Sequence, residues 1–305
     1  MADGKHMAKN GPQAQQSPQD PKPTQEDVRK RGLAKMAMAI AANIAVTLAS
    51  AVLLIMGLAP FPDNPILGAA AGRIAASVVI LLVLVLLGGR SWMGISGKGL
   101  AYTFRRAWPL LLVGIVPSVS TFYQALTGSG LPEGFFSSLA VTALLCIAIG
   151  VMEEYLFRGI QLNALLAGLG GWRWGVIVSV VISAIMFGRT HVAQESVTGN
   201  VAAMQAALKI VQTAMFGVVL SETVMHTREL GSAAVFHALN DFIMMSASVA
   251  LQGSQTVGSS YINVDQASNV YLAYGIMIAV YLLPTILAFL TIWKEHQTCR
   301  GAFME

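Results

Sequence analysis

Charged residues are scarce in this sequence. Asp, Glu, Lys and Arg make up 11% of its 305 residues, whereas apolar residues make up 55%. Soluble domains carry roughly 25% charged residues, so the composition argues against a soluble protein. A mean hydropathy of +0.64 indicates a membrane protein instead.

Cysteine is also nearly absent, which argues against a fold held by disulfides. Cys146 lies within an apolar run, and Cys299 lies near the end of the chain. The formal net charge is +4, but the basic residues gather at the ends of apolar runs and in the N-terminal segment. We therefore expect no nucleic-acid partner.

Residues 1–28 are rich in Pro, Gln, Asp and Lys and show no apolar periodicity. Such a segment has nothing to bury, so we predict a disordered cytoplasmic tail. Residues 29–305 would then form one transmembrane domain. Its first apolar run, at about 36–58, is longer than the core of a signal peptide and further runs follow it, so we expect a retained helix.

Eight runs are apolar enough to be membrane-spanning helices. They lie at about 36–58, 66–88, 107–126, 135–168, 174–191, 201–221, 231–250 and 269–293. The fourth is long enough to tilt or to protrude from the bilayer. The sixth is interrupted by Lys209, with Gln205 and Gln212 on the same helical face. The expected fold class is all-α, a polytopic membrane helical bundle.

Lys and Arg are unevenly divided between the connections. The N-terminal segment, the connection 89–106, Arg173, Arg228 and the C-terminal segment all carry basic residues on one side. The opposite connections carry none: 59–65, 127–134, 192–200 and 251–268. All five tryptophans also fall on the basic side. The positive-inside rule therefore predicts an integral membrane protein with both termini in the cytoplasm.

Three charged residues interrupt the fourth run: Glu153, Glu154 and Arg158, in GVMEEYLFRGIQLNAL. Ionisable groups are costly within a bilayer and usually serve a function. Glu154 and Arg158 are four residues apart, so we predict a structural ion pair. Glu153 is rotated by about 100° from Glu154 and has no partner in its own helix. We therefore predict that Glu153 is the reactive carboxylate, a general base. The alternative is a satisfied polar cluster that joins helices.

Two further polar sites could meet Glu153. Phe187 and His191 share a face at the end of the fifth run, in FGRTH. Counted from the glycine-rich turn near 168–171, Glu153 lies ~22 Å along one helix and His191 ~26 Å along the next, at similar depth. Taken alone, His191 would be read as an interfacial histidine at a helix end.

The seventh run carries the second polar site, in VFHALNDF. His237, Asn240 and Asp241 are spaced three and four residues apart, which puts them on one helical face. They could donate to an oxyanion, bind a metal ion or form a buried hydrogen-bonded pair.

The order EEYLFR, FGRTH and HALND resembles the CPBP family, the type II CAAX-processing and bacteriocin-processing intramembrane endopeptidases. The family pattern is EExxxR, FxxxH and HxxxN or HxxxD, and all three parts occur here in that order. The motifs cover residues from about 140 to 245, while the flanking runs match only in number and hydropathy.

This resemblance implies a glutamate-dependent endopeptidase whose substrates are membrane-associated, CAAX-like or leader peptides. Glu153 and His191 would activate a water molecule, while His237 and Asp241 would stabilise the oxyanion. Many members have Asn at position 241. An ionised Asp would repel an oxyanion, so Asp241 would be protonated or would orient His237, or Asn240 would supply the donor.

Other functions stay open at this stage. Glu153, His191 and His237 could bind Zn²⁺, but the chain has no H-E-x-x-H motif and the three ligands would come from three helices, so we expect no cofactor. The string Gly94-Ile-Ser96-Gly97 is similar to a rhomboid protease motif but lies in a basic connection, where we expect a turn. A transporter would show an inverted repeat, and none is evident. A non-catalytic scaffold, immunity protein or regulatory protein of the same fold is the remaining alternative.

Overall fold

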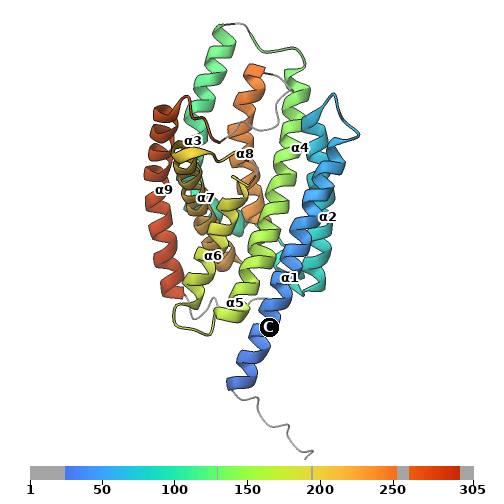
Figure 1. The fold of residues 1–305 in the computed structure, drawn as a ribbon, viewed down its shortest axis with the longest axis vertical. Helices are drawn as coiled ribbons and strands as arrows, with labels where there is room; N and C mark the ends of the chain where they lie inside the picture. Colours follow the sequence, from blue (N-terminus) through green and yellow to red (C-terminus); the bar gives the residue numbers. More distant parts are fainter. Residues whose placement is uncertain (1–24, 129, 194, 253–260, 296–305) are drawn as a thin grey trace, which may run out of the picture.

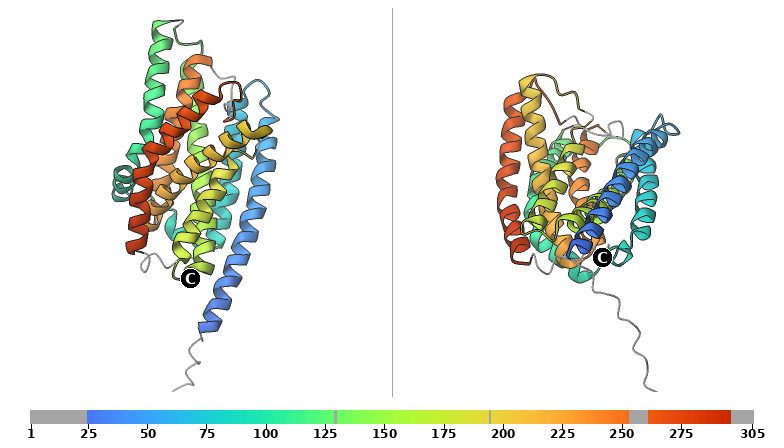
Figure 2. Two further views of the ribbon diagram at one scale, coloured as in Figure 1. Left: turned by 60° about the vertical axis from the view of Figure 1, so that its left-hand side comes forward. Right: turned by 60° about the horizontal axis from the view of Figure 1, so that its bottom comes forward.

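A computed structural model describes residues 25–128, 130–193, 195–252 and 261–295 of the chain. Within these residues the helices are joined by short connections, and there are no strands. The helices run up and down the bundle, with α4 near its middle and α1 and α9 on opposite flanks (Figures 1 and 2). The expected all-α helical bundle is confirmed.

The first half of the bundle comprises α1 (Gln25–Leu58), α2 (Pro65–Leu86), the short 3₁₀ helix η1 (Gly89–Trp92) and α3 (Gly97–Thr127). α1 thus begins at Gln25, and residues 1–24 of the predicted tail lie outside the described residues. Asn64 caps α2 by accepting a hydrogen bond from the amide of Leu67. Ser96 caps α3 by accepting one from the amide of Gly99, so the rhomboid-like string lies in the irregular connection before α3, which it enters at Gly97.

The second half begins with a continuous helical segment made of α4 (Phe135–Glu154), the π-helix η2 (Tyr155–Leu162) and α5 (Asn163–Leu169). It continues with α6 (Gly175–Thr190), α7 (Gly199–Thr227), α8 (Leu230–Gln252) and α9 (Ala267–Glu295). α4 packs between α2 and α8, while α7 packs between α6 and α9.

All eight predicted spans coincide with helices, and six helices are long and apolar enough to cross a membrane. The segment from Phe135 to Leu169 counts as one of these. The fifth predicted span, α6, is a shorter apolar helix of 16 residues. α8 is not among the six found in the described residues, and it carries the polar residues His237, Asn240 and Asp241. The chain is an integral membrane protein with a polar centre.

Glycine permits two close helix contacts next to that centre. A Cβ atom at Gly150 of α4 would lie 2.5 Å from the carbonyl oxygen of Ala234 in α8. One at Gly188 of α6 would lie 2.5 Å from the carbonyl oxygen of Ile210 in α7. Side chains larger than hydrogen would push these helices apart. Both glycines lie within one turn of a predicted site residue, Glu153 or His191.

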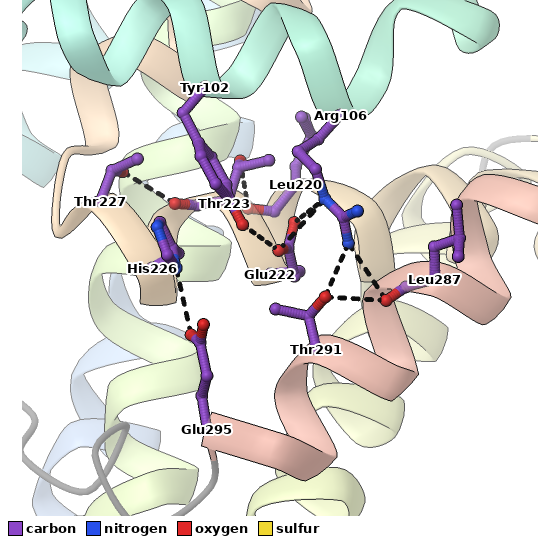
Figure 3. Close-up of polar contacts among 10 residues, drawn as sticks. All are labelled: Tyr102, Arg106, Leu220, Glu222, Thr223, His226, Thr227, Leu287, Thr291 and Glu295. Atoms are coloured by element: carbon purple, nitrogen blue, oxygen red, sulfur yellow. Dashed lines mark hydrogen bonds and ion pairs between the residues drawn. The ribbon is translucent and has the colours of Figure 1, made fainter.

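A second polar cluster joins α3, α7 and α9 near the end of the bundle where α9 finishes (Figure 3). The buried carboxylate of Glu222 accepts a hydrogen bond from the hydroxyl of Tyr102 at 2.6 Å and pairs with Arg106 at 3.4 Å. Arg106 also donates to the carbonyl of Leu287 and the hydroxyl of Thr291 on α9. These contacts fix the position of α7, which forms one wall of the candidate site. The free thiol of Cys146 is buried, and Cys299 lies outside the described residues.

Candidate active site

The site is built around the imidazole of His237 on α8. Its Nδ1 lies 2.7 Å from Oε1 of Glu154, a hydrogen-bond distance. Its Nε2 faces Oε2 of Glu153 at 3.7 Å and Oδ2 of Asp241 at 3.6 Å, distances too long for a direct hydrogen bond. Because Nδ1 is occupied by Glu154, the ring presents Nε2 to the space between Glu153 and Asp241.

The two adjacent glutamates differ in their surroundings. Glu154 is fully buried and its Oε1 also lies 3.0 Å from Nη1 of Arg158, the ion pair that the spacing predicted. Glu153 keeps 14% of its side chain exposed. Its Oε2 has no hydrogen-bond partner within the described part of the chain. Each glutamate has an Oε2 atom without a hydrogen-bond partner in the described chain, but Glu154 is held through Oε1 by two partners, while Glu153 is the more exposed of the two.

Arg158 is held in place from several directions. Its guanidinium lies over the ring of Phe187, 4.4 Å from the centroid, and only 1% of the residue is exposed. The π-helix η2 carries it, and Asn163 donates hydrogen bonds to the carbonyls of Arg158 and Gly159. π-Helical turns leave main-chain carbonyls without regular partners and are frequent at functional sites.

Phe187 connects the two histidines. Its ring contacts the ring of His191 edge-on at 4.8 Å and that of His237 at 5.9 Å. Nδ1 of His191 lies 3.0 Å from the carbonyl oxygen of Phe187. A carbonyl can only accept, so this nitrogen donates and the neutral ring keeps the lone pair on Nε2. Within the described residues, Glu153 and His191 form no direct ion pair, so they could act together only through a molecule held between them.

The two polar residues that follow His237 in the third motif, Asn240 and Asp241, make different contacts. Asp241 lies beside Nε2 of His237, with 23% of its side chain exposed. The amide nitrogen of the buried Asn240 makes a long contact, 4.0 Å, with the sulfur of Met244, and the side chain also interacts with Asp241. Oδ1 of Asn240 is without a hydrogen-bond partner among the residues described. Asp241 is thus the residue of this pair that faces the imidazole.

Two contacts of the site were not predicted from the sequence. Residue spacing predicts Arg158 as a partner of Glu154 but not His237, because the second contact depends on how closely α8 approaches α4. Arg73 on α2, which interacts electrostatically with Glu153, was also not predicted. A lone arginine within an apolar run is itself a signal, and it would have identified Arg73 as a site candidate.

A metal site was the alternative assignment for Glu153, His191 and His237. Across the described residues, no group of three or more His, Cys, Asp or Glu side chains could hold a metal ion. Nδ1 of His237 is also occupied by Glu154. A metal-independent reaction stays a prediction, which chelation tests.

The fold and this cluster define a polytopic helical membrane protein with an acid–histidine–arginine site inside the bundle. Residues 135–243 match the family described as type II CAAX prenyl endopeptidase Rce1-like. The matched segment carries the site and supports the resemblance of this chain to the CPBP or CAAX protease family of membrane proteases. No curated protein matches the chain at a significant level.

Proposed function

We propose that this protein is an intramembrane endopeptidase that hydrolyses peptide bonds with water activated by Glu153 and His191. The observation that carries the proposal is the contrast between the two glutamates. Glu154 is fully buried and its Oε1 is held by Arg158 and His237, whereas Glu153 keeps 14% of its side chain exposed and its Oε2 lies 3.7 Å from Nε2 of His237, beyond hydrogen-bond distance. A general base must reach its substrate proton, and only Glu153 meets that requirement.

In the proposed reaction, a water molecule donates a hydrogen bond to the carboxylate of Glu153 and another to Nε2 of His191. Glu153 takes one proton as the water oxygen attacks the peptide carbonyl carbon. The C–O double bond becomes a C–O⁻ single bond in a tetrahedral intermediate. The protonated Glu153 then gives its proton to the peptide nitrogen, the C–N bond breaks, and a carboxylic acid and an amine leave.

The negative charge of the intermediate needs donors close to Glu153. Nε2 of His237 is the nearest candidate, since it already faces the Glu153 carboxylate. Because Nδ1–H is donated to Glu154, Nε2 carries a proton only in the imidazolium form of the ring, so the proposed donor is a His237 imidazolium paired with Glu154. The hydrogen bond that Nδ1 of His237 donates to Glu154 orients the ring, and Arg158 holds Glu154 in turn. Asp241, at 3.6 Å from the same nitrogen, would either orient His237 or act as a donor in its protonated form. Removing one oxyanion donor typically lowers turnover by ~10²–10³.

The family match and the location of the site support a substrate class. The site lies inside a membrane bundle, so we propose peptides or proteins associated with the bilayer, including CAAX-like C-terminal peptides and leader peptides, as substrates. We further propose that both chain termini face the cytoplasm, on the basis of the uneven distribution of Lys and Arg.

The test replaces Glu153 by glutamine, which keeps the shape but cannot accept the proton. Membranes from cells that produce the wild type or Glu153→Gln are compared by mass spectrometry of peptide termini. We expect a set of wild-type-dependent termini to disappear in the variant, while the purified variant unfolds at the wild-type temperature. Glu133→Gln, an exposed acid in a connection, is the matched control. Unchanged termini with Glu153→Gln would reject the proposal.

A chelation series distinguishes the metal-free route from a zinc route. The purified protein is dialysed against a strong chelator and assayed on a peptide that carries one of the Glu153-dependent termini. Full activity after removal of bound metal supports the proposed reaction. Activity that disappears and returns on addition of Zn²⁺ would assign the site to a metal.

A further inference from the structure

Lys209 places a cation deep in α7, beside the candidate site. Only 9% of the residue is exposed. Its Nζ lies 3.3 Å from Oε1 of Gln212 and 4.0 Å from the centroid of the Tyr261 ring. A buried ammonium group loses its hydration, so the π face of a tyrosine becomes a strong partner for it. The lysine therefore fixes the position of that ring.

The backbone around Tyr261 is anchored by four hydrogen bonds. The amide of Tyr261 donates to Oε1 of Glu195 at 2.8 Å, and its carbonyl accepts from the hydroxyl of Tyr274 at 3.1 Å. The buried side chain of Gln205 bonds both the amide and the carbonyl of Asn263, each at 2.8 Å. Residues 261–263 are thus fastened to α7, α9 and the connection after α6, although they belong to no helix.

The ring of Tyr261 also lies near His191. Their centroids are 6.3 Å apart, with an angle of 53° between the planes. The other aromatic neighbour of His191 is Phe187, at 4.8 Å. Tyr261 keeps 39% of its surface exposed, whereas Phe187 keeps 1%. His191 therefore has one buried aromatic neighbour and one that faces outward.

We propose that Tyr261, held by Lys209, is a positioning residue that restrains His191 in the orientation needed to bind the attacking water. This inference rests on the proposed function, and it extends the site beyond residues 135–243, where the family match ends. Phe187 and the hydrogen bond at Nδ1 fix one side of the imidazole, and Tyr261 limits its movement on the outward side. Lys209 acts on His191 through the tyrosine ring.

Chemical modification of histidine tests the contact without any substrate. Full-length protein in detergent is treated with diethylpyrocarbonate, and the rate at which each histidine is modified is measured by mass spectrometry of its peptide. We expect His191 to react several times faster in Tyr261→Leu, which keeps apolar bulk but lacks the π face, and in Lys209→Met. Tyr261→Phe keeps the aromatic ring and Lys209→Arg keeps the cation, so His191 should be modified at the wild-type rate in both variants.

Two other histidines serve as internal controls. His237 is buried with 3% exposed, and His226 is partly exposed at the end of α7. His237 should stay slow and His226 should keep its wild-type rate in every variant, which shows that the fold is intact. A His191 rate that is the same in Tyr261→Leu and the wild type, with both controls unchanged, overturns the proposal. If Tyr261→Leu unfolds, Lys209→Met decides the outcome by the same criterion.

Kinetics on a peptide with a Glu153-dependent terminus then tests the link to catalysis. Misplacement of a reacting group lowers the chemical step, so kcat should fall about 10- to 100-fold in Tyr261→Leu with KM nearly unchanged. Tyr261→Phe should restore most of kcat. Equal kcat in the leucine variant and the wild type would reject the positioning role. Should no Glu153-dependent cleavage exist, the proposed function fails, while the modification rates still decide whether Tyr261 restrains His191.

Discussion

Nδ1 of His237 lies 2.7 Å from Oε1 of Glu154, and this contact joins α8 to α4 at the centre of the bundle. The same oxygen lies 3.0 Å from Nη1 of Arg158. One carboxylate thus holds a histidine and an arginine that are both almost completely buried. The two motifs that supply these residues are separated by more than 70 positions, so the contact also fixes the relation between distant parts of the chain.

Removing the Glu154 carboxylate should therefore damage the fold. In Glu154→Ala the guanidinium of Arg158 loses its buried partner, and such a loss typically costs about 3–5 kcal/mol. We expect a marked fall in the unfolding temperature of the purified protein. Glu154→Gln keeps an acceptor for Nδ1 of His237, so its unfolding temperature should fall less. The double variant Glu154→Ala with Arg158→Met removes the unpaired charge and should recover part of the loss. Equal unfolding temperatures for Glu154→Ala and the wild type would contradict this prediction.

The sequence predicted much of the fold because a bilayer admits few backbone arrangements. Buried main-chain groups in lipid need internal hydrogen bonds, so long apolar runs become helices, and all eight predicted runs are helical. The break into π-helix η2 after Glu154 was not predicted. It depends on packing around Arg158 and Asn163, which hydropathy does not register.

Contacts of the candidate site within one helix were predicted from the sequence, whereas contacts between helices were not. Spacing within one helix identified the Glu154–Arg158 pair, and four-residue spacing put His237 and Asp241 on one face. Contacts between helices do not follow from spacing. A shared site for His237 and the glutamates was predicted only from the family resemblance. Tyr261 was missed, because it lies in a polar connection whose course the sequence does not define.

Position 241 holds Asp, one of the two residues in the pattern of the family that the chain resembles. Asparagine has nearly the shape of aspartate and adds an N–H donor, so Asp241→Asn should keep activity near the wild-type level. Asp241→Leu removes both the donor and the contact with His237, and should lower kcat by about 10²-fold. Steady-state kinetics on a Glu153-dependent peptide measures both. If Asp241→Asn abolishes activity, the carboxylate itself takes part in proton transfer and the proposed role of Asp241 is wrong.

Gly150 should be required for the assembly of the site. A Cβ at this position would lie 2.5 Å from the carbonyl of Ala234 and 3.1 Å from the side chain of Ala238. Gly150→Ala therefore forces α8 away from α4, and overpacking of this kind costs about 1–3 kcal/mol. We expect a lower unfolding temperature and a weaker Glu154–His237 contact. Gly275→Ala in α9 is the matched control, since nothing lies within 4 Å of the added Cβ. The prediction fails if the two variants are equally stable.

Arg106 should stabilise the bundle far from the candidate site. Its side chain pairs with the buried carboxylate of Glu222 and donates to two groups on α9, the carbonyl of Leu287 and the hydroxyl of Thr291 (Figure 3). Arg106 is partly exposed, so the loss is smaller than for a fully buried ion pair. We expect Arg106→Met to cost about 1–3 kcal/mol, because a buried charge loses its hydrogen bonds.

The neighbouring Arg105 provides the control for that measurement. It is exposed, and its described contact is with the ring of Tyr102 at 5.4 Å. Arg105→Met should leave the unfolding temperature nearly unchanged, while Arg106→Met lowers it. Adding Glu222→Gln to Arg106→Met should restore part of the stability, since a neutral amide can still accept the hydrogen bond from Tyr102 without burying a charge. A double variant no more stable than Arg106→Met would show that the contacts with α9, and not the charge of Glu222, account for the effect.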